Sequence, residues 1–540
     1  MPEFTCWWKE GVVYQIYPRS FQDSNGDGIG DIKGIVNRLE YLKWLGVTAL
    51  WLSPIYQSPM YDFGYDISDY RQIDPAFGTM EDVLVLISKA HGIGIKIIFD
   101  MVLNHTSHLH AWFKESAMDM NSSKRDFYIW HENFQDKKPN NWLAAFGGSA
   151  WTIHKKSNQY YLHSFLKEQP DLNWRNPAVV DAVFAEVAYW LELGVDGFRL
   201  DVINLIGKNE LLKNNPLKIG ASIRPYDMQN HIFDRNDPVA HIKLAEFRAL
   251  LERYQDRMLV GEIMVEKPGS PKIAASYLGN GKDELHLAFD FSFIWIRWNA
   301  GKWRIAAEKW YACIPNDGWP CWVLSNHDVV RAITRFGNNI SKAKIAAMFL
   351  LTQKGTPFIY YGEEIGMKDK KLPRKSIQDP VGKRYWPFHP GRDGQRRPMQ
   401  WNDSHQAGFT SHAAWLPLHR EYIDNSVDAQ QKDPGSLLNF YKNLIILRNN
   451  DIVLRLGDCQ YETTDDPDVL CYIRRYFGEY RLILLNFARR KKKISIKTIL
   501  NNTKRESVSM LFSTESRESE NICDGEIKLL GYQGVVLSLK

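Results

Sequence analysis

Eight short runs of apolar, β-branched and aromatic residues recur along this 540-residue chain, with longer amphipathic stretches between them. The runs lie at 12–17, 49–52, 95–101, 197–200, 258–260, 285–289, 322–324 and 357–360. Short strands that alternate with amphipathic helices are typical of repeated βα units around a parallel sheet. A count of eight favours a closed barrel over an open doubly wound sheet. We therefore predict an α/β fold built on a (β/α)₈ TIM barrel.

Two long polar segments interrupt the spacing of these runs. Residues 105–173, between the third and fourth runs, are too many for a bare loop and should have a small fold of their own. Residues 368–433 follow the eighth run and are predicted to insert over one end of the barrel. From about residue 456 the pattern changes to alternating strands, at 469–474, 481–486 and 534–539. We predict a barrel (1–104 and 174–455), an inserted domain B (105–173) and an all-β C-terminal sandwich (456–540).

Composition limits the compartment and the partners. A net charge of +5 is small for this length, and the basic run at 489–493 is more typical of a solvated strand end than of a nucleic-acid contact. The six cysteines have no CxxC spacing, which fits a reducing compartment. No apolar stretch reaches membrane length, and residues 1–8 lack a basic region followed by an apolar run. We expect a cytoplasmic monomer or homodimer that binds neither nucleic acid nor membrane.

Acidic residues stand at the ends of four predicted strands: Asp100, Asp201, Glu262 and Asp328. A single carboxylate in such a place usually makes a salt bridge or caps a helix. In a barrel, however, the carboxyl ends of the strands open on one face, so these four should converge. Retaining cleavage of a glycosidic bond needs one carboxylate that attacks the anomeric carbon and one acid that protonates the departing oxygen, about 5 Å apart. Asp201 and Glu262 are the candidates.

The segments that carry these residues resemble the four motifs of the α-amylase family of glycoside hydrolases, and within it the exo-acting α-glucosidases and oligo-1,6-glucosidases. They are DMVLNH (100–105), GFRLD (197–201), GE (261–262) and SNHD (325–328), with a fifth, QPDLN, at 169–173. The resemblance extends from Tyr14 to about Trp401. It implies that Asp201 is the nucleophile, Glu262 the general acid/base and Asp328 a third carboxylate that holds sugar hydroxyls.

The neighbours of these carboxyl groups fit such roles. Arg199 lies two residues before Asp201, on the same side of the strand, where it can keep the nucleophile ionised. Glu262 has to be protonated when it first acts, so its surroundings should raise its pKa relative to that of Asp201. By resemblance, His105 and His327 donate hydrogen bonds to sugar hydroxyls.

Further positions are similar to those that enclose a terminal glucose in α-glucosidases. Asp62 and Tyr65 match the carboxylate and the aromatic platform for the sugar ring. Arg392, in the segment GRDGQRRPMQW (391–401), is expected to meet Asp62 and close the pocket, although Arg396 lies in the same segment. A closed inner end implies exo action. Two aromatic side chains, Phe146 and Phe165, match the pocket entrance, with core packing as the alternative.

The segment 23–31 alternates oxygen-bearing and small residues. It resembles the start of an EF-hand loop, but its twelfth position is Gly34 instead of Glu, and it follows a strand. In the α-glucosidase relatives this segment binds a structural Ca²⁺, or Mg²⁺; a metal-free turn is the alternative. The expected ligands are Asp23, Asn25, Asp27, Ile29 and Asp31.

The resemblance implies a retaining exo-acting α-glucosidase for short oligosaccharides such as maltose, isomaltose or sucrose. A glucosyltransferase or sucrose isomerase with the same residues is the first alternative. A second, from another class, is the non-catalytic branch that serves amino-acid transporters; its members have a membrane span and have lost the catalytic carboxylates. The linkage stays open, because Val202 is typical of enzymes that cut α-1,6 bonds, whereas 283–290 and 319–322 are closer to α-1,4-acting relatives.

Overall fold

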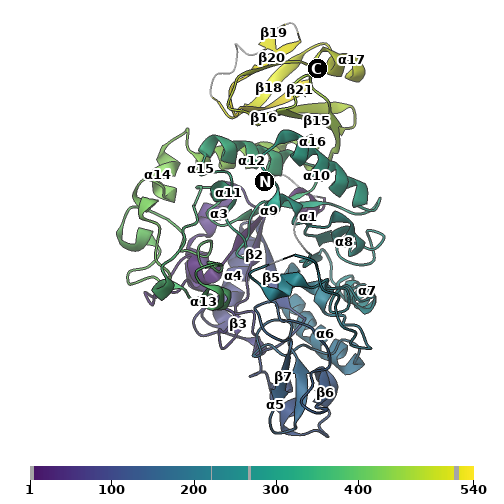
Figure 1. The fold of residues 1–540 in the computed structure, drawn as a ribbon. Coiled ribbons are helices and arrows are strands. Elements are labelled where there is room, and N and C mark those ends of the chain that lie inside the picture. The colour runs from purple at the N-terminus through teal and green to yellow at the C-terminus, as the bar shows by residue number, and fades with distance from the viewer. Residues whose placement is uncertain (1–4, 221, 266–268, 516–521, 524) are drawn as a thin grey trace.

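The computed structural model describes residues 5–220, 222–265, 269–515, 522–523 and 525–540. Figure 1 shows a central barrel, with a small antiparallel sheet at one end of the molecule and the C-terminal sheets at the other. The prediction that residues 1–8 lack a basic region followed by an apolar run falls partly on residues 1–4, which lie outside the described residues.

The eight predicted strands form one parallel sheet, in the order β11-β10-β9-β5-β2-β1-β13-β12. They are β1 (Val13–Ile16), β2 (Ala49–Leu52), β5 (Lys96–Val102), β9 (Gly197–Asp201), β10 (Met258–Gly261), β11 (Leu287–Ala288), β12 (Cys321–Val323) and β13 (Thr356–Tyr360). The two end strands meet where the thiol of Cys321 donates to the carbonyl of Ala288 at 3.2 Å. The barrel fold is thus confirmed.

Both faces of the barrel strands are buried, which explains why they read as continuous apolar runs. One set of side chains fills the interior, including Trp51, Ile98, Val260 and Phe358. The other set packs under the surrounding helices. The helices that follow barrel strands or complete the surrounding layer are α2 (Ile32–Asn37), α3 (Leu39–Leu45), α4 (Met80–Gly92), α6 (Pro177–Glu192), α7 (Val239–Leu251), α8 (Pro271–Ser276), α10 (Ala300–Cys313), α12 (Ile340–Thr352) and α15 (Leu437–Asn450).

Local sequence signals set where several helices begin. Thr79 and Asp82 form a reciprocal capping box at the start of α4. Asn176 caps α6, and Pro177 occupies its first turn, where the missing N–H costs nothing. The short helices are α1 (Trp7–Glu10), α9 (Ser292–Trp295), α11 (Ala332–Arg335), α13 (Pro380–Tyr385), α14 (Val427–Lys432) and α16 (Ile452–Leu456).

The segment after β5 has a small fold of its own. It contains α5 (Ala111–Met118) and a three-stranded antiparallel sheet of β6 (Trp130–Glu132), β8 (Gln159–Leu162) and β7 (Trp151–His154). Trp142, Trp151 and Tyr160 form its apolar core. A bridge between His105 and Asp171 joins the two ends of the segment. A short hairpin of β3 (Tyr56–Gln57) and β4 (Asp69–Ile73) lies in the connection after β2.

The C-terminal strands form two antiparallel sheets. The larger contains β14 (Asp458–Glu462), β15 (Val469–Tyr476), β16 (Glu479–Asn486), β21 (Gly534–Leu539) and β18 (Val508–Ser513). The smaller contains β17 (Lys492–Ser495), β20 (Glu526–Leu529) and β19 (Ile522–Cys523), and α17 (Lys497–Thr503) follows β17. Alternate residues of β15 point to opposite faces: Cys471 joins the core with the smaller sheet, and Tyr472 packs on the barrel.

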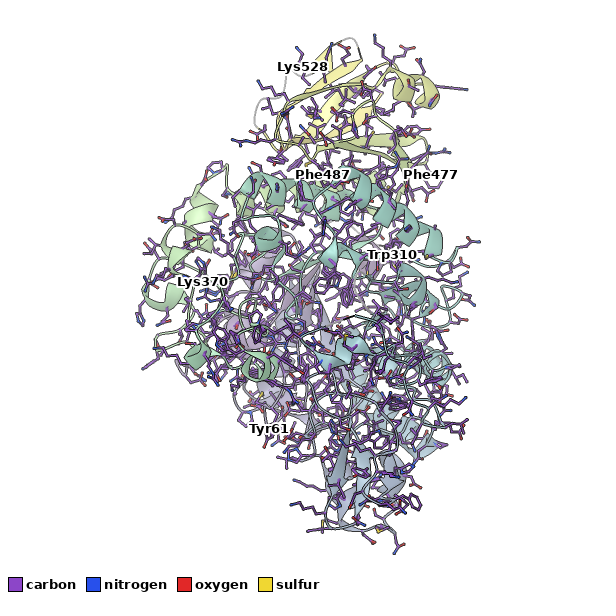
Figure 2. All side chains as sticks on the ribbon, viewed as in Figure 1. Tyr61, Trp310, Lys370, Phe477, Phe487 and Lys528 are labelled. Atoms are coloured by element: carbon purple, nitrogen blue, oxygen red, sulfur yellow. The ribbon has the colours of Figure 1, made fainter. Side chains whose placement is uncertain are left out.

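The C-terminal sheets contact the barrel through aromatic side chains. The ring of Phe487 lies 4.6 Å from Trp298 and 5.3 Å from Trp303, measured between centroids. The indole of Trp298 donates to the carbonyl of Phe487 at 3.0 Å. Figure 2 shows Phe487 at this junction.

The described part of the chain contains no helix with the length and apolarity needed to cross a bilayer. Five cysteines are free thiols: Cys6, Cys313, Cys321, Cys459 and Cys471. The side chain of Cys523 lies outside the described residues.

Candidate active site

The carboxyl ends of neighbouring barrel strands bring the acidic residues together. Asp100 of β5 is paired in register with Arg199 of β9, and Val102 with Asp201. Gly261 of β10 is paired with Leu200, so Glu262 follows β10 beside the end of β9. Side chains more than sixty residues apart in sequence thus become neighbours at one end of the sheet, as the sequence predicts.

Arg199 is the centre of the site. Its Nη1 donates to Asp100 at 2.8 Å and to Asp201 at 2.7 Å, and its Nη2 donates to Glu262. The guanidinium is almost fully buried. Because adjacent nitrogens of one planar fork bind Asp201 and Glu262, the two carboxyl groups lie side by side. This arrangement fits a retaining pair better than an inverting pair, in which a water separates the carboxyl groups.

Burial dominates the electrostatics of this pair. It raises the pKa of both groups, and that of Asp201 more than that of Glu262, which is not the order expected from the sequence; Arg199 opposes the shift for each. The negative charge of Glu262 further raises the pKa of Asp201, and that of Asp328 raises the pKa of Glu262. Two adjacent buried carboxyl groups favour a state with a single proton between them. The pair therefore supplies one acid and one carboxylate. Arg199 contacts both groups instead of Asp201 alone.

A second ion cluster closes the inner end of the site. Arg392 binds Asp62 at 2.7 Å, Asp328 at 3.2 Å and Asp379 at 2.6 Å. Arg396 also binds Asp328, at 2.6 Å. Burial opposes ionisation of Asp328, but the guanidinium groups of Arg392 and Arg396 hold its pKa well below the ordinary value. Arg392 is thus the arginine that meets Asp62, and both arginines hold Asp328.

His327 lies behind the ion cluster and belongs to a chain of hydrogen bonds. The amide of Gln15 bonds to its Nδ1 at 2.8 Å, and its Nε2 bonds to the Tyr65 hydroxyl at 2.8 Å. That hydroxyl donates to Asp100 at 3.0 Å. The rings of Tyr65 and His327 stack, with centroids 5.3 Å apart. Burial lowers the pKa of His327 to about 3, so the imidazole is neutral. Both of its nitrogens have protein partners.

His105 reaches the same region from the end of β5. Its Nε2 lies 3.0 Å from the Tyr65 carbonyl and 3.0 Å from the amide of Gln169. Its ring lies 5.2 Å from that of Phe165. Burial lowers the pKa of His105 to about 4, so it also stays neutral.

These side chains surround a cavity of about 470 Å³. Phe146 and Phe165 line it and make an edge-to-face contact at 5.4 Å. The guanidinium of Arg392 lies 4.7 Å from the centre of the Phe146 ring. The predicted residues that line the cavity are Asp62, Tyr65, His105, Phe146, Phe165, Asp201, Glu262, Asp328 and Arg392. Arg199 and His327 support this lining from behind.

The backbone turns sharply after Asp201. Val202 has φ 36° and ψ 44°, a left-handed conformation that β-branched residues rarely adopt. The turn places the Val202 side chain on the cavity wall and aligns the next N–H, of Ile203, with the Glu262 carbonyl at 3.0 Å. Such strain persists where the surroundings fix the chain, and it is common at active sites.

One wall of the cavity was missed by the sequence reasoning. It comes from the connection between β9 and α7 and contributes Lys218, Arg224, Tyr226, Asp227, His231 and Arg235. The available signal was length, because about forty residues separate the fourth strand from the next helix, as long as a functional loop. Asp100 and Gln169 lie within the recognised motifs, but their contacts with Arg199 and His105 depend on other segments.

The predicted metal segment forms a network of turns around two aspartates. Oδ1 of Asp23 accepts hydrogen bonds from the backbone N–H groups of Asn25 and Gly26. Its Oδ2 accepts hydrogen bonds from the backbone N–H of Gly28 and the hydroxyl of Thr410. Each of the two carboxylate oxygens thus already accepts two hydrogen bonds. The described residues contain no group of three or more His, Cys, Asp or Glu side chains arranged to hold an ion. The fit to a cation is incomplete in this arrangement.

The remaining predicted ligands take part in the same network. Asp31 caps α2 by accepting the N–H of Gly34, and it also bonds to Ser24. Asp27 accepts the N–H of Ile29 at 2.8 Å. Metal binding at this segment therefore stays a prediction.

The chain is similar to known proteins over most of its length. The model of the α-amylase catalytic domain matches residues 15–457. The chain belongs to the α-amylase family of glycoside hydrolases. An oligo-1,6-glucosidase of Parageobacillus thermoglucosidasius is 41% identical over 89% of this chain and 90% of its own length. A probable α-glucosidase of Rhizobium meliloti is 40% identical over 89% of each chain.

The same family contains a solved structure that matches over the full length. The crystal structure of an α-glucosyl transfer enzyme has a TM-score of 0.93 and 39% identity, and covers 99% of this chain and 100% of its own. These α-amylase-family relatives include hydrolases and a transferase, so likeness alone leaves the acceptor and the linkage open.

Proposed function

We propose that this protein is a retaining, exo-acting α-glucosidase that releases glucose from the non-reducing end of short oligosaccharides. The observation that carries the proposal is the placement of Asp201 and Glu262 on one guanidinium group beside a cavity of about 470 Å³. At its inner end, Arg392 ties Asp62 to Asp328. In this proposal the terminal sugar ring lies between the carboxyl pair and this barrier.

The reaction proceeds in two steps. A carboxylate oxygen of Asp201 forms a bond to the anomeric carbon while the glycosidic C–O bond breaks. Glu262 gives its proton to the departing oxygen, so the leaving sugar departs as an alcohol. In the second step Glu262 takes a proton from a water molecule, the water oxygen attacks the anomeric carbon, and the bond to Asp201 breaks. Two inversions give net retention.

The other site residues hold the sugar during these steps. Asp62 and Asp328, each fixed by Arg392, are placed to accept hydrogen bonds from hydroxyls of the terminal glucose. Tyr65 lines the cavity, where its ring can contact the apolar face of the sugar. Maltose, isomaltose and sucrose are the candidate substrates.

The anomer of the released glucose tests the mechanism. Purified protein is mixed with maltose, isomaltose, sucrose and trehalose, and the products are followed by NMR before mutarotation. We expect initial release of α-glucose. Initial β-glucose would contradict retention.

Glucosyl transfer is the second candidate, because a solved transfer enzyme aligns along the whole chain. In transfer, another sugar in place of water attacks the intermediate on Asp201. Product analysis across acceptor concentrations separates the two: we expect free glucose in dilute substrate, and net transfer under that condition would favour the alternative. A non-catalytic role does not fit, since Asp201, Glu262 and Asp328 are all present.

We further propose a cytoplasmic location, which the free thiols of the described cysteines support.

A further inference from the structure

Two pairs of guanidinium groups in or behind the cavity differ in their counter-charges. The two inner ones, Arg199 and Arg392, each bind three carboxylates. The two outer ones, Arg224 and Arg235, belong to the wall between β9 and α7. Their charges are far less compensated.

Arg235 lines the cavity and is only 5% exposed. Its Nη1 donates to the carbonyl of Met264 at 3.0 Å. Within the described part of the chain, no carboxylate lies within 4.0 Å of this guanidinium; its neighbour Asp234 binds His231 at 2.7 Å instead. The charge of Asp234 acts on Arg235 without direct contact and is shared with His231, so an anion that enters the cavity would give this buried cation a direct counter-ion.

Arg224 lies on the same wall. The guanidinium carbons of Arg224 and Arg235 are each 5.9 Å from the centroid of the Tyr226 ring. Arg224 donates to the carbonyl of Ala145 at 3.0 Å, and its Nε is buried without a hydrogen-bond partner. Its carboxylate neighbour, Asp227, is 3.8 Å away and 48% exposed, so the pair is weak.

The wall lies beside the general acid. Met264, whose carbonyl holds Arg235, follows Glu262 by two residues, and the Tyr226 hydroxyl contacts its sulfur at 3.9 Å. Under the proposed mechanism Glu262 protonates the oxygen of the leaving sugar. The two outer arginines therefore lie on the side of the cavity where Glu262 would protonate the leaving sugar.

We propose that Arg224 and Arg235 form a site for an anionic substituent, a phosphate ester or a carboxylate, on the leaving sugar. This inference rests on the proposed function and names its preferred substrate class. Arginine suits both anions, because its planar fork donates two parallel hydrogen bonds to a pair of oxygens.

Inhibition of the unmodified protein gives the first test. Hydrolysis of a neutral aryl α-glucoside is inhibited with glucose, glucose 6-phosphate or glucuronate. We expect at least one of the two anions to bind about tenfold or more tightly than glucose, because hydrogen bonds to charged groups are stronger than those between neutral groups. This difference in affinity should decrease as salt is added. The phosphate and the carboxylate are distinguished by which anion inhibits. If neither binds more tightly than glucose, the inference is wrong.

Substrates and variants give the second test. A disaccharide that carries phosphate on its reducing-end glucose should have a higher kcat/KM than its neutral parent. Arg235→Gln and Arg224→Gln should each bring the ratio of the two kcat/KM values, phosphorylated to neutral substrate, closer to one. Arg71→Gln, which removes an exposed cation paired with Glu186 outside the cavity, should leave it unchanged. Melting temperatures check that the variants fold. If Arg235→Gln does not fold, Arg224→Gln alone tests the proposal.

The two proposals fail in different ways. Normal hydrolysis of the aryl α-glucoside with no preference for anionic inhibitors or substrates overturns this inference alone. No hydrolysis of any α-glucoside by the unmodified protein contradicts the proposed function itself.

Discussion

At the scale of single residues, Arg199 determines much of the chemistry of the site. Its one positive charge is shared among Asp100, Asp201 and Glu262, so the cluster is short of positive charge. A proton that stays on one of these carboxyl groups reduces the repulsion. Burial also raises the pKa of Asp100, to about 6. Charge balance thus favours a state in which the three carboxyl groups hold at least one proton among them.

Replacing the nucleophile tests its role most directly. Asp201→Asn keeps the side-chain volume but removes the attacking carboxylate, so kcat should fall by several orders of magnitude with little change in folding. Hydrolysis assays and circular dichroism measure the two effects. Asp424→Asn, at an exposed position, is the control and should be as active as the unmodified protein. Near-normal activity of Asp201→Asn would refute the assignment.

The pH dependence follows from the raised pKa of Glu262. Glu262 acts as an acid only while protonated, and burial raises its pKa above the ordinary 4.5. As pH rises through this raised pKa, the proton is lost and activity falls. At lower pH a second proton neutralises the carboxyl pair, the attacking carboxylate is lost, and activity falls again. We expect a bell-shaped profile of kcat/KM whose alkaline side lies above pH 4.5, and loss of that alkaline limb in Glu262→Gln. An alkaline limb below that pH would argue against a buried acid.

At the scale of elements, barrel strands were easier to predict than the loops that complete the site. Burial on both faces makes the strands continuous apolar runs, so all eight could be located from the sequence. Strand β11 proved shorter than its run at 285–289, because only Leu287 and Ala288 pair with β10. Contacts such as Arg235 with Met264 join different loops, and no local pattern encodes them.

The loop at residues 23–31 gives a prediction at this scale. If it binds Ca²⁺ or Mg²⁺, the ion must compete with the N–H donors that now surround Asp23. We expect millimolar Ca²⁺ to raise the melting temperature, EDTA to reverse the effect, and Asp27→Ala to abolish it, since ligands that bind only the folded state stabilise it. The same Ca²⁺ series with Asp424→Asn is the control. An unchanged melting temperature would mean that hydrogen bonds alone hold this loop.

At the scale of the whole molecule, the C-terminal sheets stabilise the barrel at the end opposite the inserted segment (Figure 1). Arg474 of β15 donates to the carbonyls of Thr352 and Leu454, and the buried Arg448 donates to that of Leu351. These carbonyls include the last ones of α12, which have no partners within the helix. The sequence predicted an all-β C-terminal part, but not that its Arg474 caps a barrel helix, because Arg474 and Thr352 are 122 positions apart.

The aromatic junction at Phe487 gives a prediction at this scale. Phe487→Ala removes contacts with Trp298 and Trp303, so the free energy of unfolding should fall by about 3–5 kcal/mol. KM should stay unchanged, because Phe487 does not line the cavity. Urea denaturation and initial-rate kinetics measure both quantities. Phe477→Ala, at a side chain that is 92% exposed, is the control. A changed KM with unaltered stability would contradict this account.

The barrier made by Arg392, Asp62 and Asp328 fixes what a long substrate yields. A polymer can enter only with its terminal ring, so each visit shortens it by one unit and produces a monosaccharide, whatever its length. Longer chains supply more rounds of trimming but no larger fragments. A chain whose last ring bears a bulky modification is protected along its whole length, because no inner bond can reach Asp201.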